Sequence, residues 1–161
     1  MRIVLQRVSR SKVTVDNNVI GSIKKGVLLL VGVHHDDTTE KASWLASKCA
    51  DLRIFNDSNK KMNLSLKDID GEALVVSQFT LFGDCRKGRR PSFIEAASPQ
   101  KGEELYLHFV KQLKKQIRKV ETGIFGAMMK VELVNDGPVT LLLEQQKSKA
   151  ISPEYIGTLP I

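Results

Sequence analysis

The 161-residue chain is predicted to fold as an α+β protein with a single β-rich domain spanning residues 1–161. Apolar segments of strand length crowd the first 33 residues and recur near 73–82 and 129–143. Only two segments, near 41–50 and 99–120, carry apolar residues at helical spacing. No internal repeat or linker divides the chain. We therefore expect antiparallel and mixed sheets in a barrel-like arrangement, with two main helices packed on the sheet.

The first 33 residues predict four strands. Alternating apolar residues indicate strands at 1–9 and 11–15. Asp16-Asn17-Asn18 is a turn by residue type, and 19–23 completes a hairpin. Residues 27–33 form a continuous apolar run, which is typical of a strand that is buried on both faces.

Two helix starts carry capping signals. Residues 37–40 form a variant of the capping box before a helix at 41–50. Ser98 and Pro99 place a cap residue before proline at the first helical position, and the helix is expected to run to Val120. The lysine-rich face of this second helix is either a solvated surface or an RNA contact.

The net charge of +7 and the pI near 9.5 favour an anionic partner, of which nucleic acid is the commonest. A membrane surface is a weaker candidate, because interfacial binding prefers basic residues gathered on one amphipathic terminal helix, and they are not gathered so here. The charge is also compatible with a role in solubility alone. No apolar run approaches 18 residues and no signal peptide is evident. Cys49 and Cys85 match no metal spacing, so we expect free thiols and a cytoplasmic protein. Residues 147–161 are polar and then Pro-containing, as loose C-terminal tails often are.

The predicted strand at 73–82 contains three polar side chains, Ser77, Gln78 and Thr80. A buried strand must hydrogen-bond such groups or use them. They mark either a strand end, where polarity rises, or a site built from hydroxyls, an amide and the ring of Phe79.

Residues 135–140, Asn-Asp-Gly-Pro-Val-Thr, lie between two apolar runs and predict a corner between strands. Gly137 can adopt backbone angles closed to other residues, whereas Pro138 has no N–H and a fixed φ. The corner is therefore either a rigid turn or a fixed backbone surface with carbonyls aimed at a ligand.

Nucleophilic and metal chemistry have little support in the sequence. A Thr80 or Ser77 nucleophile needs a base, and the three histidines are His34, His35 and His108. Adjacent histidines point apart in a strand or turn, and no third ligand is evident, so neither a metal nor a cofactor is expected. Hydrolase, zinc-protease and nucleotide-binding motifs are absent from the sequence.

Three motifs together resemble the D-aminoacyl-tRNA deacylase family: Ser77-Gln78-Phe79-Thr80-Leu81, the Gly-rich segment 122–129, and Asn135 to Thr140. The start of the chain, Met1 to Val8, is similar as well, so the resemblance covers residues 1–145. It implies hydrolysis of the ester that joins a D-amino acid to the 3′-terminal adenosine of tRNA. It also implies a homodimer with cross-subunit active sites, and glycyl-tRNA as a second substrate.

The resemblance also implies residue roles. The ester site would contain Ser77, Gln78, Phe79 and Thr80. Substrate binding and rejection of L-amino acids would involve Gly137, Pro138, Asn135, Thr140 and Arg7, with a cis Gly-Pro bond reaching into the partner's site. Phe125 and Met129 would hold the adenine. No acid or base residue is implied, because the adenosine 2′-hydroxyl would help a water molecule to attack.

Two other functions stay open from the sequence. A basic RNA- or DNA-binding module without catalysis would account for the charge and the lysine-rich helix. A proofreading domain that acts only when attached to a synthetase would need a linker, and the sequence contains none.

Overall fold

The computed structural model describes residues 1–145 of the 161-residue chain. The predicted C-terminal tail, 147–161, lies outside the described residues. In chain order the elements are β1 (Arg2–Val15), β2 (Asn18–Ile23), β3 (Gly26–Gly32), α1 (Thr39–Asp51), β4 (Phe55–Asn56), β5 (Met62–Leu64), β6 (Glu72–Ser77), the 3₁₀ helix η1 (Phe79–Phe82), α2 (Pro99–Lys114), β7 (Val120–Thr122) and β8 (Lys130–Glu144).

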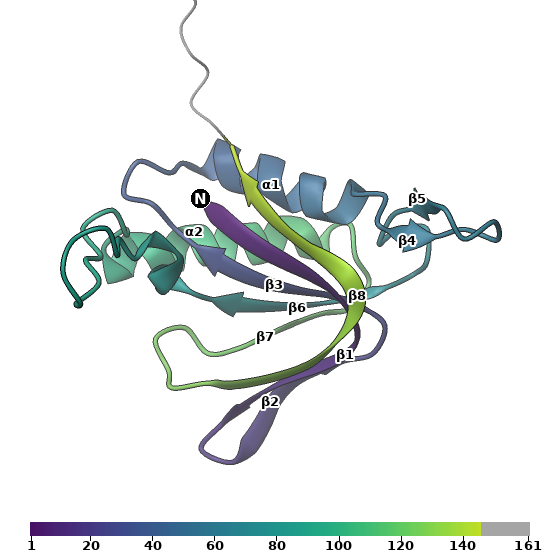
Figure 1. Cartoon of the computed structure of the whole chain (residues 1–161), viewed down its shortest axis with the longest axis horizontal. Coiled ribbons are helices and arrows are strands. Elements are labelled where there is room, and N and C mark those ends of the chain that lie inside the picture. The colour runs from purple at the N-terminus through teal and green to yellow at the C-terminus, as the bar shows by residue number, and fades with distance from the viewer. Residues whose placement is uncertain (146–161) are drawn as a thin grey trace, which may run out of the picture.

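One mixed sheet organises the fold, and β1 is its central strand. β1 pairs antiparallel with β3 through its first half, with β2 through its second half, and with β8 along almost its whole length. β3, β6 and β7 extend the sheet as parallel neighbours. Figure 1 shows β8 curving with β1, which gives the strongly bent, barrel-like sheet that the sequence predicted.

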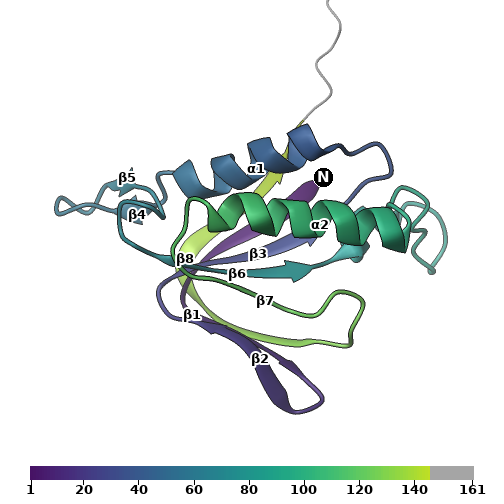
Figure 2. The same cartoon turned by 180° about the vertical axis from the view of Figure 1, so that it is seen from behind.

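Helices α1 and α2 lie side by side on the same face of this sheet (Figure 2). Hydrogen bonds between part-buried side chains join α1 to α2 and to the residues just after it. The Ser43 hydroxyl lies 2.8 Å from Nε2 of His108, and Gln116 donates to the Ser47 hydroxyl at 3.1 Å. Neither helix, nor any other within residues 1–145, is long and apolar enough to cross a bilayer.

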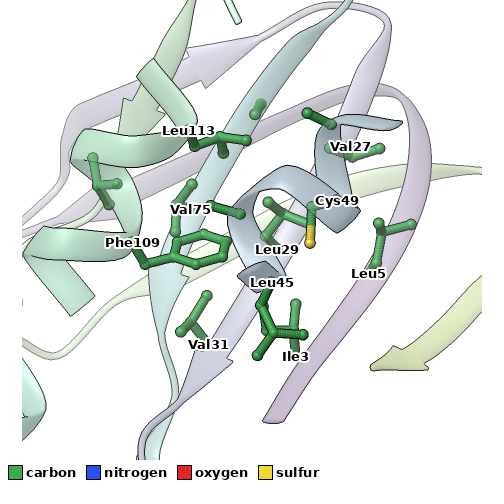
Figure 3. Packing of buried hydrophobic residues seen from close by; sticks show 14 of the residues in the cluster. Ile3, Leu5, Val27, Leu29, Val31, Leu45, Cys49, Val75, Phe109 and Leu113 are labelled. Atoms are coloured by element: carbon green, nitrogen blue, oxygen red, sulfur yellow. The ribbon is translucent and has the colours of Figure 1, made fainter. Parts of the chain in front are cut away.

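The main core fills the space between the two helices and the sheet (Figure 3). Phe109 and Leu45 pack there against Val31, Leu29 and neighbouring strand residues. A smaller cluster on the opposite face of the sheet contains Leu28. Because alternate residues of β3 enter the two clusters, the prediction that this strand is buried on both faces is confirmed.

The predicted start of α2 is confirmed, and α1 begins two residues before the predicted 41, inside the segment that carried the capping signal. Thr38 caps α1 by accepting a hydrogen bond from the backbone N–H of Lys41. Ser98 caps α2 in the same way through Lys101, and Pro99 occupies the first helical position.

Three predicted boundaries were wrong. The strands expected at 1–9 and 11–15 are one strand, β1, because β8 pairs with both halves. The helix expected to reach Val120 ends at Lys114. Ile117 nevertheless stays buried, so residues at apolar helical spacing continue beyond the end of the helix. Val120 belongs to β7. The strand expected at 73–82 ends at Ser77, and η1 follows it.

The Gly-Pro segment is also placed differently from the prediction. Asn135 to Thr140 is not a corner between two strands but an irregularity inside the single strand β8. The sheet continues on both sides of it because β1 supplies partners before and after the irregularity.

Candidate active site

The carboxyl ends of three parallel strands meet at one edge of the sheet. Val31 of β3 pairs with Ser77 of β6, and Val75 of β6 pairs with Thr122 of β7. The segments that leave these strands therefore start beside one another (Figure 1). They are the His34–His35 turn, residues 78–80, and the Gly-rich segment after Thr122. Crevices at such an edge commonly bind ligands in sheets with parallel strands.

The motif from Ser77 to Thr80 turns away from the sheet at this edge. The backbone N–H of Gln78 donates to the Val31 carbonyl at 2.8 Å, which fixes the start of the turn. The Gln78 amide then donates to the Thr80 hydroxyl. Phe79 is 58% exposed, and its ring meets the ring of Phe93 edge-on at 5.1 Å. The motif thus presents an amide, a hydroxyl and an aromatic face to solvent.

In the part of the chain that the structure describes, no base accompanies these hydroxyl groups. Among residues 1–145, neither Ser77 nor Thr80 is hydrogen-bonded to a histidine or a carboxylate. His108 lies between the two helices, where it contacts Ser43 and Gln112. A Ser–His or Thr–His nucleophile pair is therefore not formed in the described chain.

His34 and His35 gain a partner that the sequence did not indicate, Glu95. Nε2 of His34 lies 2.8 Å from the Glu95 carboxylate, and Nε2 of His35 lies 3.7 Å from it. The three ligand atoms fall within 4.8 Å of one another, which is close enough to hold a metal ion. However, the Asp36 backbone N–H donates to Nδ1 of His34 at 3.1 Å. That bond leaves the proton on Nε2, so His34 donates to Glu95 and its ligating lone pair is not available in this tautomer.

The two residues expected to hold adenine lie in the segment after β7. Phe125 is half-buried, with its ring 5.8 Å from that of Tyr106. Met129 packs against the smaller core cluster, and its sulfur lies so close to Gly123 that a Cβ there would meet it at 2.4 Å. Both side chains therefore stand near the carboxyl end of β7, although each is already partly engaged in packing.

The Gly137–Pro138 segment forms a bulge on β8. Val8 pairs with Asn135 and Gln6 pairs with Thr140, so residues 136–139 stand opposite a single β1 residue. The Gly137–Pro138 peptide bond is cis, and both residues are exposed.

Polar side chains secure the two ends of this bulge. The Asn135 amide donates to the Arg7 carbonyl at 2.9 Å and to the Val139 carbonyl at 3.3 Å. The Gln6 amide donates to the Thr140 hydroxyl at 3.2 Å. The side chains of Asn135 and Thr140 therefore hold the bulge against β1.

Arg7 supports the bulge from beneath. Arg7 is only 6% exposed, and its guanidinium donates to the carbonyls of Ile54 at 2.6 Å, Asp136 at 2.8 Å and Gly137 at 3.4 Å. The Asp136 carboxylate lies 3.2 Å from Nε and balances the buried charge. Sequence reasoning missed the roles of Asp136 and Ile54. Backbone acceptors leave no pattern in a sequence, whereas the acidic neighbour of Gly137 was a readable signal.

The bulge and the Ser77–Thr80 motif are far apart within one chain. Arg7 stands opposite Val27 at the start of β3, whereas Ser77 stands opposite Val31 near its end. Four residues of strand separate those rows by about 13 Å, and β1 and β3 lie between the two motifs. Figure 1 agrees, because the bend in β8 lies at one end of the sheet and β6 ends at the other.

Comparison with known proteins identifies the relatives of this arrangement. The profile of the D-Tyr-tRNA(Tyr) deacylase family matches residues 4–144. A D-aminoacyl-tRNA deacylase from Thermotoga petrophila is 60% identical over 147 residues, which are 91% of this chain and 99% of the relative. A D-aminoacyl-tRNA deacylase from Clostridioides difficile is 60% identical over 148 residues, which are 92% and 99% of the two chains.

A solved structure with a different name is also similar. The c-Myc DNA Unwinding Element Binding Protein is 39% identical and superposes with a TM-score of 0.86 over 91% of this chain and 100% of that one. The match of residues 4–144 to the family profile and the relatives of 60% identity lead to one assignment. The chain belongs to the D-Tyr-tRNA(Tyr) deacylase family.

Proposed function

We propose that this protein is a hydrolase that cleaves the ester of D-aminoacyl-tRNA and spares L-aminoacyl-tRNA. The observation that carries the proposal is the exposed backbone bulge of β8, whose carbonyls at Asp136 and Gly137 are held by the buried Arg7. The relatives named D-aminoacyl-tRNA deacylase, at 60% identity, support the same reaction.

A held backbone surface suits the discrimination of D- from L-amino acids. Both enantiomers bury the same groups, so hydrophobic fit cannot separate them. The site must instead fix three directions around the Cα atom of the amino acid. A rigid backbone at Gly137 and Pro138 supplies such a direction for every side chain, and it excludes the L-form by steric clash. The Gly137 carbonyl oxygen has two lone pairs, so its 3.4 Å contact with Arg7 orients it without saturating it. Glycine has no side chain to exclude, so glycyl-tRNA is a second substrate of this proposal.

A complete site needs two copies of the chain. The bulge cannot approach Thr80 of its own chain, because the strand rows lie about 13 Å apart. β8 also exposes apolar side chains on both sides of the bulge, namely Leu133, Val134, Leu141 and Leu142. A second copy would cover these side chains and bring its Gly137–Pro138 segment to the Ser77–Thr80 motif. We therefore propose a homodimer with cross-subunit active sites.

The proposed hydrolysis uses a water molecule as nucleophile. Water adds to the ester carbonyl carbon, and the resulting oxyanion accepts hydrogen bonds from the Gln78 amide and backbone N–H groups. The carbon–oxygen bond to the ribose then breaks, and the ribose oxygen takes a proton, which leaves free D-amino acid and tRNA. The adenosine 2′-hydroxyl assists the water, which is consistent with the absence of a base beside Thr80 among residues 1–145. Phe125 and Met129 would contact the adenine.

A non-catalytic nucleic-acid-binding protein is the second candidate. The net charge of +7 and the name of the 39% identical DNA Unwinding Element Binding Protein favour it. Binding assays alone cannot separate the candidates, because a deacylase binds tRNA too.

The decisive experiment is deacylation of matched D- and L-aminoacyl-tRNA, with and without EDTA. The proposal predicts release of the D-amino acid, a spared L-ester, and no effect of EDTA. Equal rates on the two enantiomers would remove the stereochemical argument. Binding of both substrates without release of either would favour the second candidate.

A further inference from the structure

The segment between η1 and α2 carries a basic loop, defined here as residues 85–91. Asp84 and Ser92 close its neck by two backbone hydrogen bonds of 2.8 and 3.0 Å. Gly88, at φ +66°, allows the chain to turn at the tip. Every residue of the loop is exposed, and the hollow beside it, lined by Asp84, Arg86, Lys87 and Ser92, has a volume of about 500 Å³.

Within residues 1–145, only one of the four cations in the loop has a carboxylate partner, namely Arg86. Asp84 accepts hydrogen bonds from the backbone and the guanidinium of Arg86 at 2.8–3.0 Å, and Arg86 lowers the pKa of that carboxyl to about 2. Within residues 1–145, no carboxylate forms an ion pair with Lys87, Arg89 or Arg90. The loop, closed at its neck, thus presents three positive charges that have no carboxylate partner in the described part of the chain.

The basic loop adjoins the edge where the proposed ester site lies. Phe93 follows Ser92 of the neck, and its ring lies 5.1 Å from that of Phe79. A Cβ on Gly83, at the other end of the neck, would meet the Phe93 ring at 3.0 Å. Exposed aromatic rings beside free cations are the combination with which proteins bind single-stranded nucleic acid, by base stacking and phosphate contact.

The lysine-rich face of α2 is less suited to that role. Arg118 and Lys119, which follow the end of α2, pair with Asp70 and Glu72. The lysines at the C-terminal end of α2 also lie at the far end of the helix from the basic loop, which follows η1 and precedes the helix start (Figure 2). The lysines on this face therefore provide a control of similar charge for the three cations of the basic loop.

We propose that Lys87, Arg89 and Arg90 bind the backbone phosphates of tRNA next to its 3′ end, and so position the esterified adenosine at Phe79. This inference rests on the proposed function, because it names the surface that would deliver that substrate. The loop adds affinity that depends on the polynucleotide, whereas the residues of the ester site act on the terminal nucleoside.

The test compares two triple variants, K87Q/R89Q/R90Q and K111Q/K114Q/K115Q. Each is assayed with D-aminoacyl-tRNA and with the same D-amino acid esterified to adenosine alone. We expect the loop variant to raise KM for the tRNA at least tenfold, with kcat within about twofold, and to leave the adenosine ester unchanged. Its salt dependence should lose about two to three units of slope, since each phosphate contact contributes about 0.7–0.9. The α2 variant should match the wild type.

Several results would overturn the inference. Equal effects of the two triples would show a nonspecific charge effect, and an equal loss on the adenosine ester would place the loop in the chemical site. If the wild type released no D-amino acid, the proposed function would fail. The loop would still be tested by the affinity for uncharged tRNA, which the loop variant must lower at least tenfold. Weaker binding of single-stranded DNA with unchanged binding of tRNA would assign the loop to DNA.

Discussion

Replacing Arg7 with lysine should destabilise the protein and loosen its stereochemical selection. Arg7 is buried, and its guanidinium lies between the Ile54 carbonyl on one side and the Asp136 and Gly137 carbonyls on the other. A lysine ammonium is a compact group on a flexible stem, and it cannot reach acceptors on both sides at once.

The expected cost follows from those distances. Hydrogen bonds from a charged donor contribute about 1.5–3 kcal/mol each. The bonds to Ile54 and Asp136, at 2.6 and 2.8 Å, are the two strong ones, and lysine can keep one of them. The contact with Gly137 at 3.4 Å adds little. We therefore expect Arg7→Lys to lower the free energy of unfolding by about 2–3 kcal/mol.

Urea unfolding at equal protein concentration measures this loss, because association of two copies makes stability depend on concentration. Arg10→Lys is the matched control, since Arg10 is exposed on the same strand and should change stability by less than about 0.5 kcal/mol. The same Arg7 variant should raise the ratio of L- to D-ester hydrolysis, because the carbonyls lose their anchor. A stability change no larger than that of Arg10→Lys would refute the role given to Arg7.

Four further outcomes are expected. Gly26→Ala should cost at least about 3 kcal/mol in thermal or urea unfolding, because its Cβ would meet a backbone oxygen of β6 at 1.8 Å. Gly102→Ala, with no new contact closer than 3.4 Å inside α2, should instead stabilise by up to about 1 kcal/mol. Burial raises the pKa of the Cys49 thiol to about 12, so iodoacetamide at pH 8 should label the exposed Cys85 alone until denaturant is added, as mass spectrometry would show. Thr80→Ala should lower kcat by less than about 100-fold, since loss of a true nucleophile costs nearer 10⁶-fold. Complete loss of activity with substrate binding intact would restore the nucleophile hypothesis.

Local signals predicted the elements whose causes are local. The cap at Ser98, the hairpin turn at Asp16 and the apolar run of β3 each depend on a few adjacent residues, and the structure confirms them. The predicted end of α2 was wrong because Ile117 continues the buried stripe beyond Lys114, where the regular helix ends. Apolar spacing reports burial, and burial can persist beyond a helix.

Features that depend on pairing between strands distant in the sequence could not be predicted from the sequence. β1 is one strand because β8, more than 100 residues later in the chain, pairs with Val8 and with Arg10, on both sides of Ser9. Nothing local shows that the bulge at Gly137 stands opposite Arg7, or that Glu95 approaches His34. For the site, the sequence motifs identified the side chains. The hydrogen bonds that hold these side chains could be identified only from the folded structure.

Mixing two defective variants tests most directly the claim that a site shared by two copies selects D-esters. One variant, Q78A/F79A, damages the ester site, and the other, Gly137→Val, adds bulk where the bulge would meet the substrate. Differently tagged copies are unfolded, mixed and refolded, and the mixed dimers are isolated and assayed on D- and L-aminoacyl-tRNA. One of the two sites in each mixed dimer then combines the intact ester site of one copy with the intact bulge of the other.

The account predicts that each variant alone is inactive, that the mixed dimer recovers about half of the wild-type D-activity, and that the L-ester stays intact. A mixed dimer as inactive as its parents would contradict the shared site, and recovery on both enantiomers would contradict the selection.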